Sequence, residues 1–475
     1  MPLVVGVDSS TSACKVEIRD ADSGQVIATG RAPHRATTPP RSEQDPRQWW
    51  TAFESACADA GLFDAHRPAA ISVAGQQHGL VVLDAGGDVL RPAKLWNDTE
   101  SAADADALVA ALGAQAWADA CGSVPGASFT ITKLRWLRRC EPEVFARMAS
   151  VLLPHDWLTG QLTGRLTTDR GDASGTGWWS PAEERYRPDL LGLVDEAVQW
   201  AELLPQVLRP TEAAGEWRGM IVGPGTGDNM GAALGLGLGP GDLALSLGTS
   251  GTAFCVSEAP TADGTGIVAG FADAAGRYLP LVCTLNATKV TDAVARLLGV
   301  DAYGLDALAL AGPAGSGGLV LIPHFDGERT PNRPHATGAL AGIRSDVTRE
   351  ELARSAVEGV VCNLLEGARR LARCQPRRSD GRVLLIGGGA RSAAYRQVVA
   401  DLTGRLVLVP ESGEPVARGA AMQAAAVLTG RSFADLTDAW GIGSAVSVEP
   451  APSVDGAAIC AAYTHALQEG RPDDH

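Results

Sequence analysis

Three turns in this sequence combine small hydroxyl residues or glycines in a way that suits the binding of phosphate groups. They are Ser9-Ser10-Thr11-Ser12, which follows Asp8; Ser246-Leu247-Gly248-Thr249-Ser250-Gly251; and Ile386-Gly387-Gly388-Gly389-Ala390-Arg391-Ser392. Backbone N–H groups in such turns bind phosphate oxygens, and a helix that begins after a glycine turn favours an anion at its N-terminus. Each turn alone is a weak signal, because any tight turn needs similar residues.

An acid stands on a fourth turn, Gly225-Thr226-Gly227-Asp228-Asn229. A hydroxyl that attacks phosphorus must lose its proton, and a positioned carboxylate can accept that proton. Asp228 would also suit the N-cap of a helix that is expected to begin near Met230. The residues by themselves leave both roles open.

Asp8 lies at the end of the apolar run Leu3-Val4-Val5-Gly6-Val7, which predicts a buried strand. A buried carboxylate is costly unless a cation pairs with it. A bound metal cation such as Mg²⁺ would supply that charge. The alternative is an acid that caps the Ser9–Thr11 turn.

Sequence patterns typical of several other kinds of catalytic site are absent from this sequence. The chain has neither a P-loop motif nor a dinucleotide glycine motif after its first strand, and its eight histidines show no zinc-ligand spacing. No nucleophile elbow is present, and the nine cysteines form no Cys-x-x-Cys pair. The cysteines are therefore expected to be reduced.

The elements that must position these residues follow an α/β pattern. Residues 3–8 and 14–18 predict a hairpin, and residues 243–254 repeat it about half the chain later, which suggests a duplicated architecture. Helices are expected at 46–60, 101–120, 348–374, 391–403, 415–428 and 455–469, and strands at 69–74, 80–84, 281–285, 319–322, 383–386 and 406–409. The glycine-rich stretch 223–241 is the expected boundary between domains 1–240 and 241–475.

Composition excludes several classes of protein. The 475 residues are 45% hydrophobic and 20% charged, which is typical of folded chains of two or three domains. The net charge of −15 argues against nucleic acid as the main partner. Apolar runs are far shorter than the roughly 20 residues that cross a bilayer, and no signal peptide is evident, so a cytoplasmic location is expected.

Longer segments give a resemblance to a known family. Residues 128–139 and residues 338–358, which contain Leu340-Ala341-Gly342-Ile343, are similar to signature segments of the FGGY carbohydrate kinases. Shorter similar segments are Gly75-Gln76-Gln77-His78-Gly79, Leu95-Trp96-Asn97-Asp98, Leu153-Pro154-His155-Asp156-Trp157-Leu158 and Gly327-Glu328-Arg329-Thr330-Pro331. The resemblance covers residue 3 to about residue 430.

The resemblance implies an α/β fold of two actin-like (ribonuclease H-like) ATPase domains with an interdomain cleft. It further implies ATP-dependent phosphorylation of a small-molecule sugar, with D-xylulose as the expected substrate and ATP and Mg²⁺ as cofactors. A ribulose, gluconate or glycerol kinase is an alternative, and so is a non-catalytic sugar or nucleotide sensor. Retention of Asp8, Asp228 and the two threonine turns favours a kinase over a sensor, and a homodimer is left open.

The same resemblance assigns roles to individual residues. Asp228 is the expected catalytic base, and it is a second candidate for metal contact after Asp8. Expected substrate-binding residues are Gln77, His78, Asn97, Asp98 and Asn229, and expected ATP-binding residues are Thr11, Ser12, Thr249, Ser250, Gly388, Gly389 and Ser392. The sequence departs from the family pattern where glycine is usual near Ser9 or Ser10, where methionine is common at Gln77, and where many relatives have arginine at Glu100.

Overall fold

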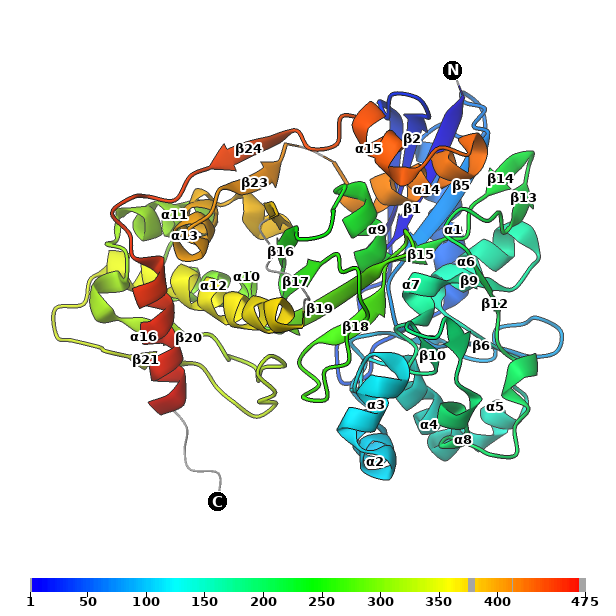
Figure 1. Cartoon of the computed structure of the whole chain (residues 1–475), viewed down its shortest axis with the longest axis horizontal. Coiled ribbons are helices and arrows are strands. Elements are labelled where there is room, and N and C mark those ends of the chain that lie inside the picture. The colour runs from blue at the N-terminus through cyan, green and yellow to red at the C-terminus, as the bar shows by residue number, and fades with distance from the viewer. Residues whose placement is uncertain (1, 375–380, 412, 470–475) are drawn as a thin grey trace. The chain divides into compact units, whose positions relative to one another are not determined.

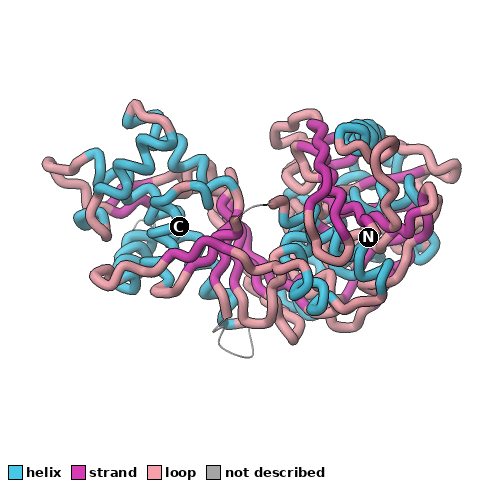
Figure 2. Tube along the Cα trace, turned by 90° about the horizontal axis from the view of Figure 1, so that it is seen from above, coloured by secondary structure: helices cyan, strands magenta, loops and turns pink. Residues whose placement is uncertain are grey.

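The computed structural model describes residues 2–374, 381–411 and 413–469, and it divides into two compact units (Figure 1). Unit 1 comprises Met1–Leu238, Ser257–Leu279 and Gly413–Gly443, and unit 2 comprises Gly239–Val256, Pro280–Ser412 and Ser444–His475. Each unit contains both helices and strands, as the alternating pattern predicts (Figure 2).

The main sheet of unit 1 has the strand order β13-β14-β5-β1-β2-β3. These strands are β1 (Leu3–Ser9), β2 (Ala13–Asp20), β3 (Val26–Pro33), β5 (Ala70–Gly75), β13 (Gly215–Trp217) and β14 (Met220–Val222). The central strand β1 runs antiparallel to β2 and parallel to β5, and β5 runs parallel to β14. The predicted hairpin at residues 3–18 is therefore confirmed.

Helices α1 (Pro46–Asp59) and α14 (Pro415–Thr429) pack on opposite faces of this sheet. Val5 and Val7 form one core with residues of α1, whereas Gly6 faces α14 so closely that a Cβ there would overlap the carbonyl oxygen of Ala417. Successive residues of a strand point to opposite faces, so the two helices cover different sides. Asp45 caps α1 by accepting a hydrogen bond from the Arg47 N–H.

The main sheet of unit 2 contains the order β19-β17-β16-β22-β23-β24. These strands are β16 (Leu243–Leu247), β17 (Gly251–Cys255), β19 (Tyr278–Thr284), β22 (Val383–Ile386), β23 (Val407–Pro410) and β24 (Ala445–Val448). As in unit 1, the central strand β16 is antiparallel to its hairpin partner and parallel to the strand on its other side. The two sheets share the same order and directions, which confirms the predicted duplication.

The remaining elements complete the two units. Unit 1 also has β4 (Glu43–Gln44), β6 (Val81–Leu83), β7 (Ala93–Lys94), α2 (Ala102–Leu112), α3 (Ala114–Cys121), α4 (Thr130–Cys140), α5 (Pro142–Ala146), β8 (Ser150–Leu152), α6 (Pro154–Thr163), β9 (Thr167–Asp169), α7 (Arg170–Ala173), β10 (Trp179–Ser180), β11 (Arg185–Tyr186), α8 (Pro188–Gly192), β12 (Gln206–Leu208), β15 (Thr226–Gly227), α9 (Asp228–Gly235), β18 (Ala269–Ala272) and α15 (Phe433–Ala439), with a 3₁₀ turn at Trp200–Glu202. Unit 2 also has α10 (Thr288–Leu298), α11 (Ala302–Ala311), β20 (Val320–Ile322), β21 (Ala339–Ala341), α12 (Arg349–Arg373), α13 (Ala393–Thr403) and α16 (Gly456–Glu469), with 3₁₀ turns at Ser316–Gly318 and Gly388–Arg391.

Two expectations differ from the structure. The single helix expected at 101–120 is broken at Gly113 into α2 and α3, because Gly113 has a positive φ of 91° that a continuous helix cannot contain. Helix α14 was expected to belong to the second domain, residues 241–475. It belongs to unit 1 instead, because it packs on β1 and β5. The chain thus first leaves unit 1 near the predicted boundary but returns to it twice.

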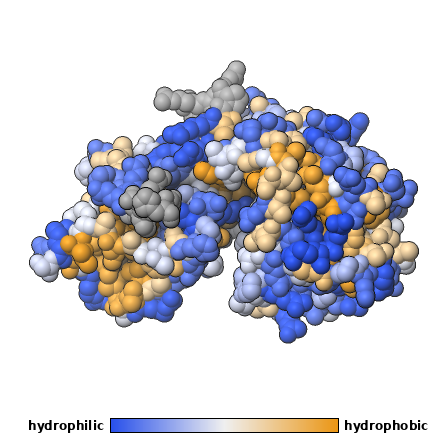
Figure 3. All heavy atoms as spheres, turned by 90° about the horizontal axis from the view of Figure 1, so that it is seen from below, coloured by the Kyte–Doolittle hydropathy of each residue, from blue (hydrophilic) through white to orange (hydrophobic). Residues whose placement is uncertain are grey.

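The outer surface agrees with the composition. Hydrophilic residues cover most of the face drawn in Figure 3, and hydrophobic residues form smaller patches between them. Within the described residues, no helix combines the length and the apolar character needed to span a bilayer.

Candidate active site

One edge of the unit 1 sheet brings together most of the predicted residues of this unit. Strands β1 and β15 both run parallel to β5, with Ser9 and Gly227 each opposite Gly75. Parallel strands end at the same edge, so the residues that follow them are neighbours there. This register places Asp8, the segment Gln76–His78 and Asp228 at a common edge.

Asp228 is the first residue of α9, and Gly227 is the N-cap of that helix. The alternative role of Asp228 as N-cap is therefore wrong. Its Oδ1 accepts hydrogen bonds from the Asn229 backbone N–H (2.8 Å) and the Asn229 side chain (3.0 Å). The side chain keeps some solvent contact, but desolvation by the surrounding protein raises its pKa to about 7, and the charges of Asp8 and Asp172 add to the shift.

Asp8 is buried at the end of β1 and pairs with a lysine. The Lys15 Nζ lies 3.2 Å from its Oδ2, and the hairpin register places the two residues opposite each other. Desolvation raises the Asp8 pKa to about 6, although Lys15 opposes the rise. Its Oδ1 has no hydrogen-bond partner among the described residues. The cation that burial requires is thus already present in the chain, and Oδ1 is left for a ligand.

The predicted sugar residues Gln77 and Asn229 contact each other. The Asn229 Nδ2 donates to the Gln77 Oε1 at 2.7 Å, and the buried Gln77 Nε2 has no hydrogen-bond partner among the described residues. An unpaired buried donor is costly unless a ligand accepts from it. Gln77 therefore presents a donor next to Asp228 that a sugar hydroxyl could satisfy.

His78 is held in a strained backbone conformation. Its φ is 66°, in the left-handed region that a non-glycine residue seldom adopts. The ring Nδ1 donates to the Gly175 carbonyl at 2.7 Å, and the ring packs on Phe129 and Phe271 with centroids 5.0 and 5.5 Å away. Strain of this kind is typical of functional positions, where the surrounding structure maintains it.

Asn97 and Asp98 have different surroundings. Asp98 is fully buried, and its carboxylate accepts from the Ser42 N–H (2.9 Å) and pairs with Lys94 (3.0 Å). The Asn97 Oδ1 is buried and has no hydrogen-bond partner among the described residues. Ser42 and Lys94 thus engage the Asp98 carboxylate, whereas the Asn97 Oδ1 can still accept a hydrogen bond from a ligand.

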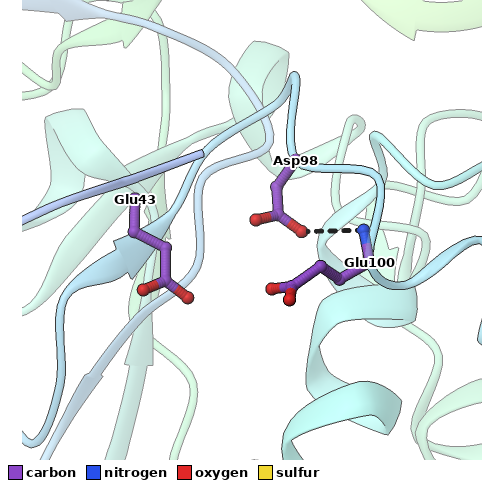
Figure 4. Close-up of side chains that lie close together, drawn as sticks. All are labelled: Glu43, Asp98 and Glu100. Carbon is purple, nitrogen blue, oxygen red and sulfur yellow. Dashed lines mark hydrogen bonds between the residues drawn. The ribbon is translucent and has the colours of Figure 1, made fainter. Parts of the chain in front are cut away.

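Glu43, Asp98 and Glu100 turn their carboxylates toward one another (Figure 4). Such a group could hold a metal ion, but the buried Lys94 Nζ lies among the three, 3.3 Å from Glu43, 3.0 Å from Asp98 and in contact with Glu100. The ammonium occupies the position that a cation would take. Glu100 is thus part of a lysine-centred network.

The predicted phosphate contacts of unit 1 are Thr11 and Ser12. The Thr11 hydroxyl donates to the Gln76 Oε1 (3.0 Å) and accepts from the Trp96 Nε1 (2.9 Å), so it links the turn to the two segments that are predicted to bind sugar. Ser12 is exposed at the tip of the hairpin. Contact of Thr11 and Ser12 with ATP stays a prediction. The Thr11 hydroxyl also has a structural role, because it bonds Gln76 and Trp96.

The predicted ATP turns of unit 2 lie side by side. Strands β16 and β22 are parallel with Ser246 opposite Ile386, so the turn at Thr249–Ser250 and the glycine turn after β22 share one edge. Thr249 and Gly388 are exposed there, and a Cβ on Gly388 would meet only the tip of Arg391 at 3.8 Å. By contrast, a Cβ on Gly389 would lie 2.7 Å from the Leu247 Cβ.

Ser392 has a structural contact that the sequence did not predict. Its hydroxyl accepts from the Tyr395 N–H (3.0 Å) as the N-cap of α13 and donates to Asp306. The Ser392 hydroxyl thus already has two protein partners, whereas Thr249 and Gly388 are exposed.

Sequence reasoning missed several residues around Asp228. Lys15 could have been found, because the predicted hairpin places it opposite Asp8. His155, Asp169, Asp172 and Gln423 gave no such signal, since they come from distant parts of the chain.

Comparison with known proteins decides the family. The N-terminal domain of the FGGY family of carbohydrate kinases matches residues 3–235, and the C-terminal domain of that family matches residues 243–428. The chain belongs to the FGGY family of carbohydrate kinases. It is therefore an ATP-dependent sugar kinase, and it has the two-domain actin-like ATPase fold of that family.

Individual FGGY relatives carry more specific names. The chain is 50% identical over 449 residues to a xylulose kinase of Streptomyces coelicolor, covering 92% of this chain and 91% of that protein. It is 36% identical over 425 residues to a xylulose kinase of Escherichia coli, covering 85% of each. A solved xylulose kinase of Bifidobacterium adolescentis superposes with a TM-score of 0.86 at 41% identity, covering 98% of this chain and 99% of that one.

Proposed function

We propose that this FGGY kinase transfers the γ-phosphoryl group of ATP to D-xylulose, which yields D-xylulose 5-phosphate. The observation that carries the substrate is the similarity to proteins named xylulose kinase, at 50% identity over 92% of the chain. The resemblance of the Gln76–His78 and Leu95–Asp98 segments supports the same sugar.

Sugar binding is proposed for the sheet edge of unit 1. Gln77 offers its unpaired Nε2 and Asn97 its unpaired Oδ1, so one donates to and the other accepts from sugar hydroxyls. His78 and Asn229 complete the set, with His78 held by Gly175 and Asn229 held by Gln77 and Asp228. Asp98 would contribute through Lys94 and Ser42 rather than by direct contact.

The candidate residues outside the proposed sugar site suit the binding of ATP and Mg²⁺. The exposed turns at Thr249–Ser250 and Gly388 can receive phosphate oxygens and a nucleotide edge, and the unpaired Oδ1 of Asp8 is a suitable oxygen for Mg²⁺ or for its bound water. When bound, Mg²⁺ neutralises charge on the phosphates. Asp8 would hold the ion, and Lys15 keeps the Asp8 carboxylate in place.

Asp228 is proposed as the general base. Its carboxylate would accept the proton of the attacking sugar hydroxyl, and Asn229 holds its Oδ1 through two hydrogen bonds. A carboxylate whose pKa lies near the working pH is a stronger base than one of ordinary pKa. Proton transfer to it from the sugar hydroxyl is therefore more favourable.

Substrate preference tests the proposed sugar directly. In a coupled assay of ADP release with D-xylulose, D-ribulose, D-gluconate and glycerol, D-xylulose should give the highest kcat/KM, by at least about tenfold, because a site that pairs buried polar groups with substrate hydroxyls discriminates strongly. A clear preference for gluconate or glycerol would refute the xylulose assignment and leave the kinase intact.

The pKa of Asp228 predicts the acidic limb of the activity profile. The base works only when ionised, and its pKa is raised from 3.8 to about 7, so kcat/KM for the sugar should fall about tenfold per pH unit below that value and level off above it. The measurement is kcat/KM at saturating MgATP between pH 5.5 and about pH 9.

A variant separates this limb from the ionisation of ATP itself. The charge of Asp172 raises the Asp228 pKa, so Asp172→Asn should move the limb to lower pH. If the acidic limb of the kcat/KM profile does not move in Asp172→Asn, the limb reports the ionisation of ATP or of another group. Its assignment to Asp228 would then be wrong.

A further inference from the structure

The turn that carries Asp228 packs directly on other segments of unit 1. We call residues 225–228 the Asp228 turn. Gly225 has a φ of 79°, and a Cβ there would lie 2.5 Å from the His155 ring and 2.9 Å from the Val73 carbonyl oxygen. The backbone of the turn therefore packs directly on α6 and β5, with no room for a side chain.

Two buried hydrogen bonds fix the turn. The Thr226 hydroxyl donates to the Asp169 Oδ2 at 3.0 Å, and the Gln423 Nε2 donates to the Gly225 carbonyl at 3.0 Å. Thr226 and Gln423 are fully buried. The Ser72 hydroxyl donates to the Gln423 Oε1 at 2.5 Å, so the oxygen of that amide faces Ser72 and its nitrogen faces the turn.

Asp169 is in turn held by a buried charge cluster. It caps α7 by accepting from the N–H groups of Gly171 (2.8 Å) and Asp172 (2.9 Å). The His155 ring lies 2.7 Å from Asp172, 3.2 Å from Asp156 and 3.7 Å from Asp169. Burial opposes a charge on His155, but these carboxylates outweigh it and raise the His155 pKa to about 9. A protonated ring therefore binds α6, β9 and α7 together behind the turn.

We propose that Asp169 and Gln423 are positioning residues for phosphoryl transfer, which hold the Asp228 turn from two sides. Neither side chain is assigned a contact with substrate. His155 acts behind Asp169 by tying it and Asp172 to α6. The proposal rests on the proposed role of Asp228 as base.

The physical reason is the geometric demand of the reaction. A base must lie within hydrogen-bond distance of the hydroxyl it deprotonates, and a misplacement of about 1 Å can cost about 10²-fold in rate. Gly225 and Gly227 lie within the Asp228 turn, and glycine is the most flexible residue, so the local sequence restrains the backbone of the turn only weakly. The two hydrogen bonds supply the restraint that the local sequence lacks.

Two substitutions remove these bonds with little change in shape. Thr226→Val removes the donor to Asp169, and Gln423→Met removes the amide that bonds Gly225. Each should lower kcat by about 10- to 100-fold while the KM values for D-xylulose and ATP stay within about threefold, because the side chains proposed to bind the substrates are unchanged and the chemical step is more sensitive to the position of the base. Amide hydrogen exchange of peptides that span residues 224–230 should become faster in both variants.

Two controls accompany them. Thr226→Ser keeps the hydroxyl and should restore both kcat and slow exchange. Thr437→Val removes a threonine hydroxyl that bonds the Phe433 carbonyl at 2.8 Å in α15, and it should change neither quantity. Should Gln423→Met fail to fold, Ser72→Ala frees the same amide from its orienting bond and should give a smaller change in the same direction.

Amide hydrogen exchange and kcat together distinguish the positioning role of Asp169 and Gln423 from the role of Asp228 as base. Unchanged exchange at 224–230 in Thr226→Val and Gln423→Met, or faster exchange with kcat within twofold of normal, would overturn the positioning role. If Asp228→Asn keeps its turnover, the base assignment fails instead, whereas the exchange data still report whether the two bonds hold the turn.

Discussion

Replacing Asp228 by asparagine should lower turnover by on the order of 10²- to 10⁴-fold, which is the usual contribution of a general base. The change is nearly isosteric and removes both the charge and the basicity of the side chain. The asparagine Oδ1 can still accept from the Asn229 N–H and side chain, so α9 should begin at the same residue. Steady-state kinetics with D-xylulose and MgATP measure the effect.

Binding measurements distinguish a lost base from a damaged site. Titration calorimetry of Asp228→Asn with D-xylulose should show binding within about tenfold of normal, and thermal unfolding should change little. Near-normal turnover in this variant would refute the base assignment. The search would then turn to Asp8, because the other acid suggested by the sequence, Asp98, is committed to Lys94 and Ser42.

The second large effect is expected at Gly388. Gly388→Val should raise the KM for ATP by about tenfold or more, because a branched side chain would project into the space proposed for the nucleotide. The protein itself has room for this side chain, since the nearest atom to a Cβ there is the Arg391 Nη2 at 3.8 Å. D-Xylulose binding and the unfolding temperature should therefore stay close to normal.

The neighbouring glycine provides a matched control. Gly387 has a φ of 88°, and a Cβ there would lie 2.6 Å from the Leu247 carbonyl oxygen. Gly387→Val should therefore destabilise unit 2 itself, which differential scanning calorimetry would detect. An unchanged KM for ATP in Gly388→Val would show that the nucleotide lies elsewhere, and equal losses of stability in both variants would make the turn a folding element.

Local elements were predictable from the sequence, because hydrophobic periodicity and turn residues act over a few positions. The hairpin at residues 3–18, its repeat at 243–254 and the buried strand 383–386 are all present. The break between α2 and α3 was missed, because a single glycine inside a helical pattern does not by itself reveal a positive φ.

The assembly of the site depended on contacts between distant segments. Thr226 reaches Asp169 across 57 positions, and Gln423 reaches Gly225 across 198. The same holds for α14: the sequence predicted a helix at 415–428 but could not tell which sheet it covers. Periodicity shows that a face is buried, and it carries no information about the partner that buries it.

The sequence by itself determined the repeated α/β architecture and the family, and it predicted Asp228 as the base, because these inferences depend on short patterns and on long similar segments. Only the tertiary structure decided that Lys15 pairs with Asp8, that Lys94 engages Asp98, and that Asp169 and Gln423 hold the Asp228 turn. The physical reason is that the ionisation of a buried group depends on its surroundings. Burial and nearby charge set the pKa of Asp228, and both arise only when separate parts of the chain pack together.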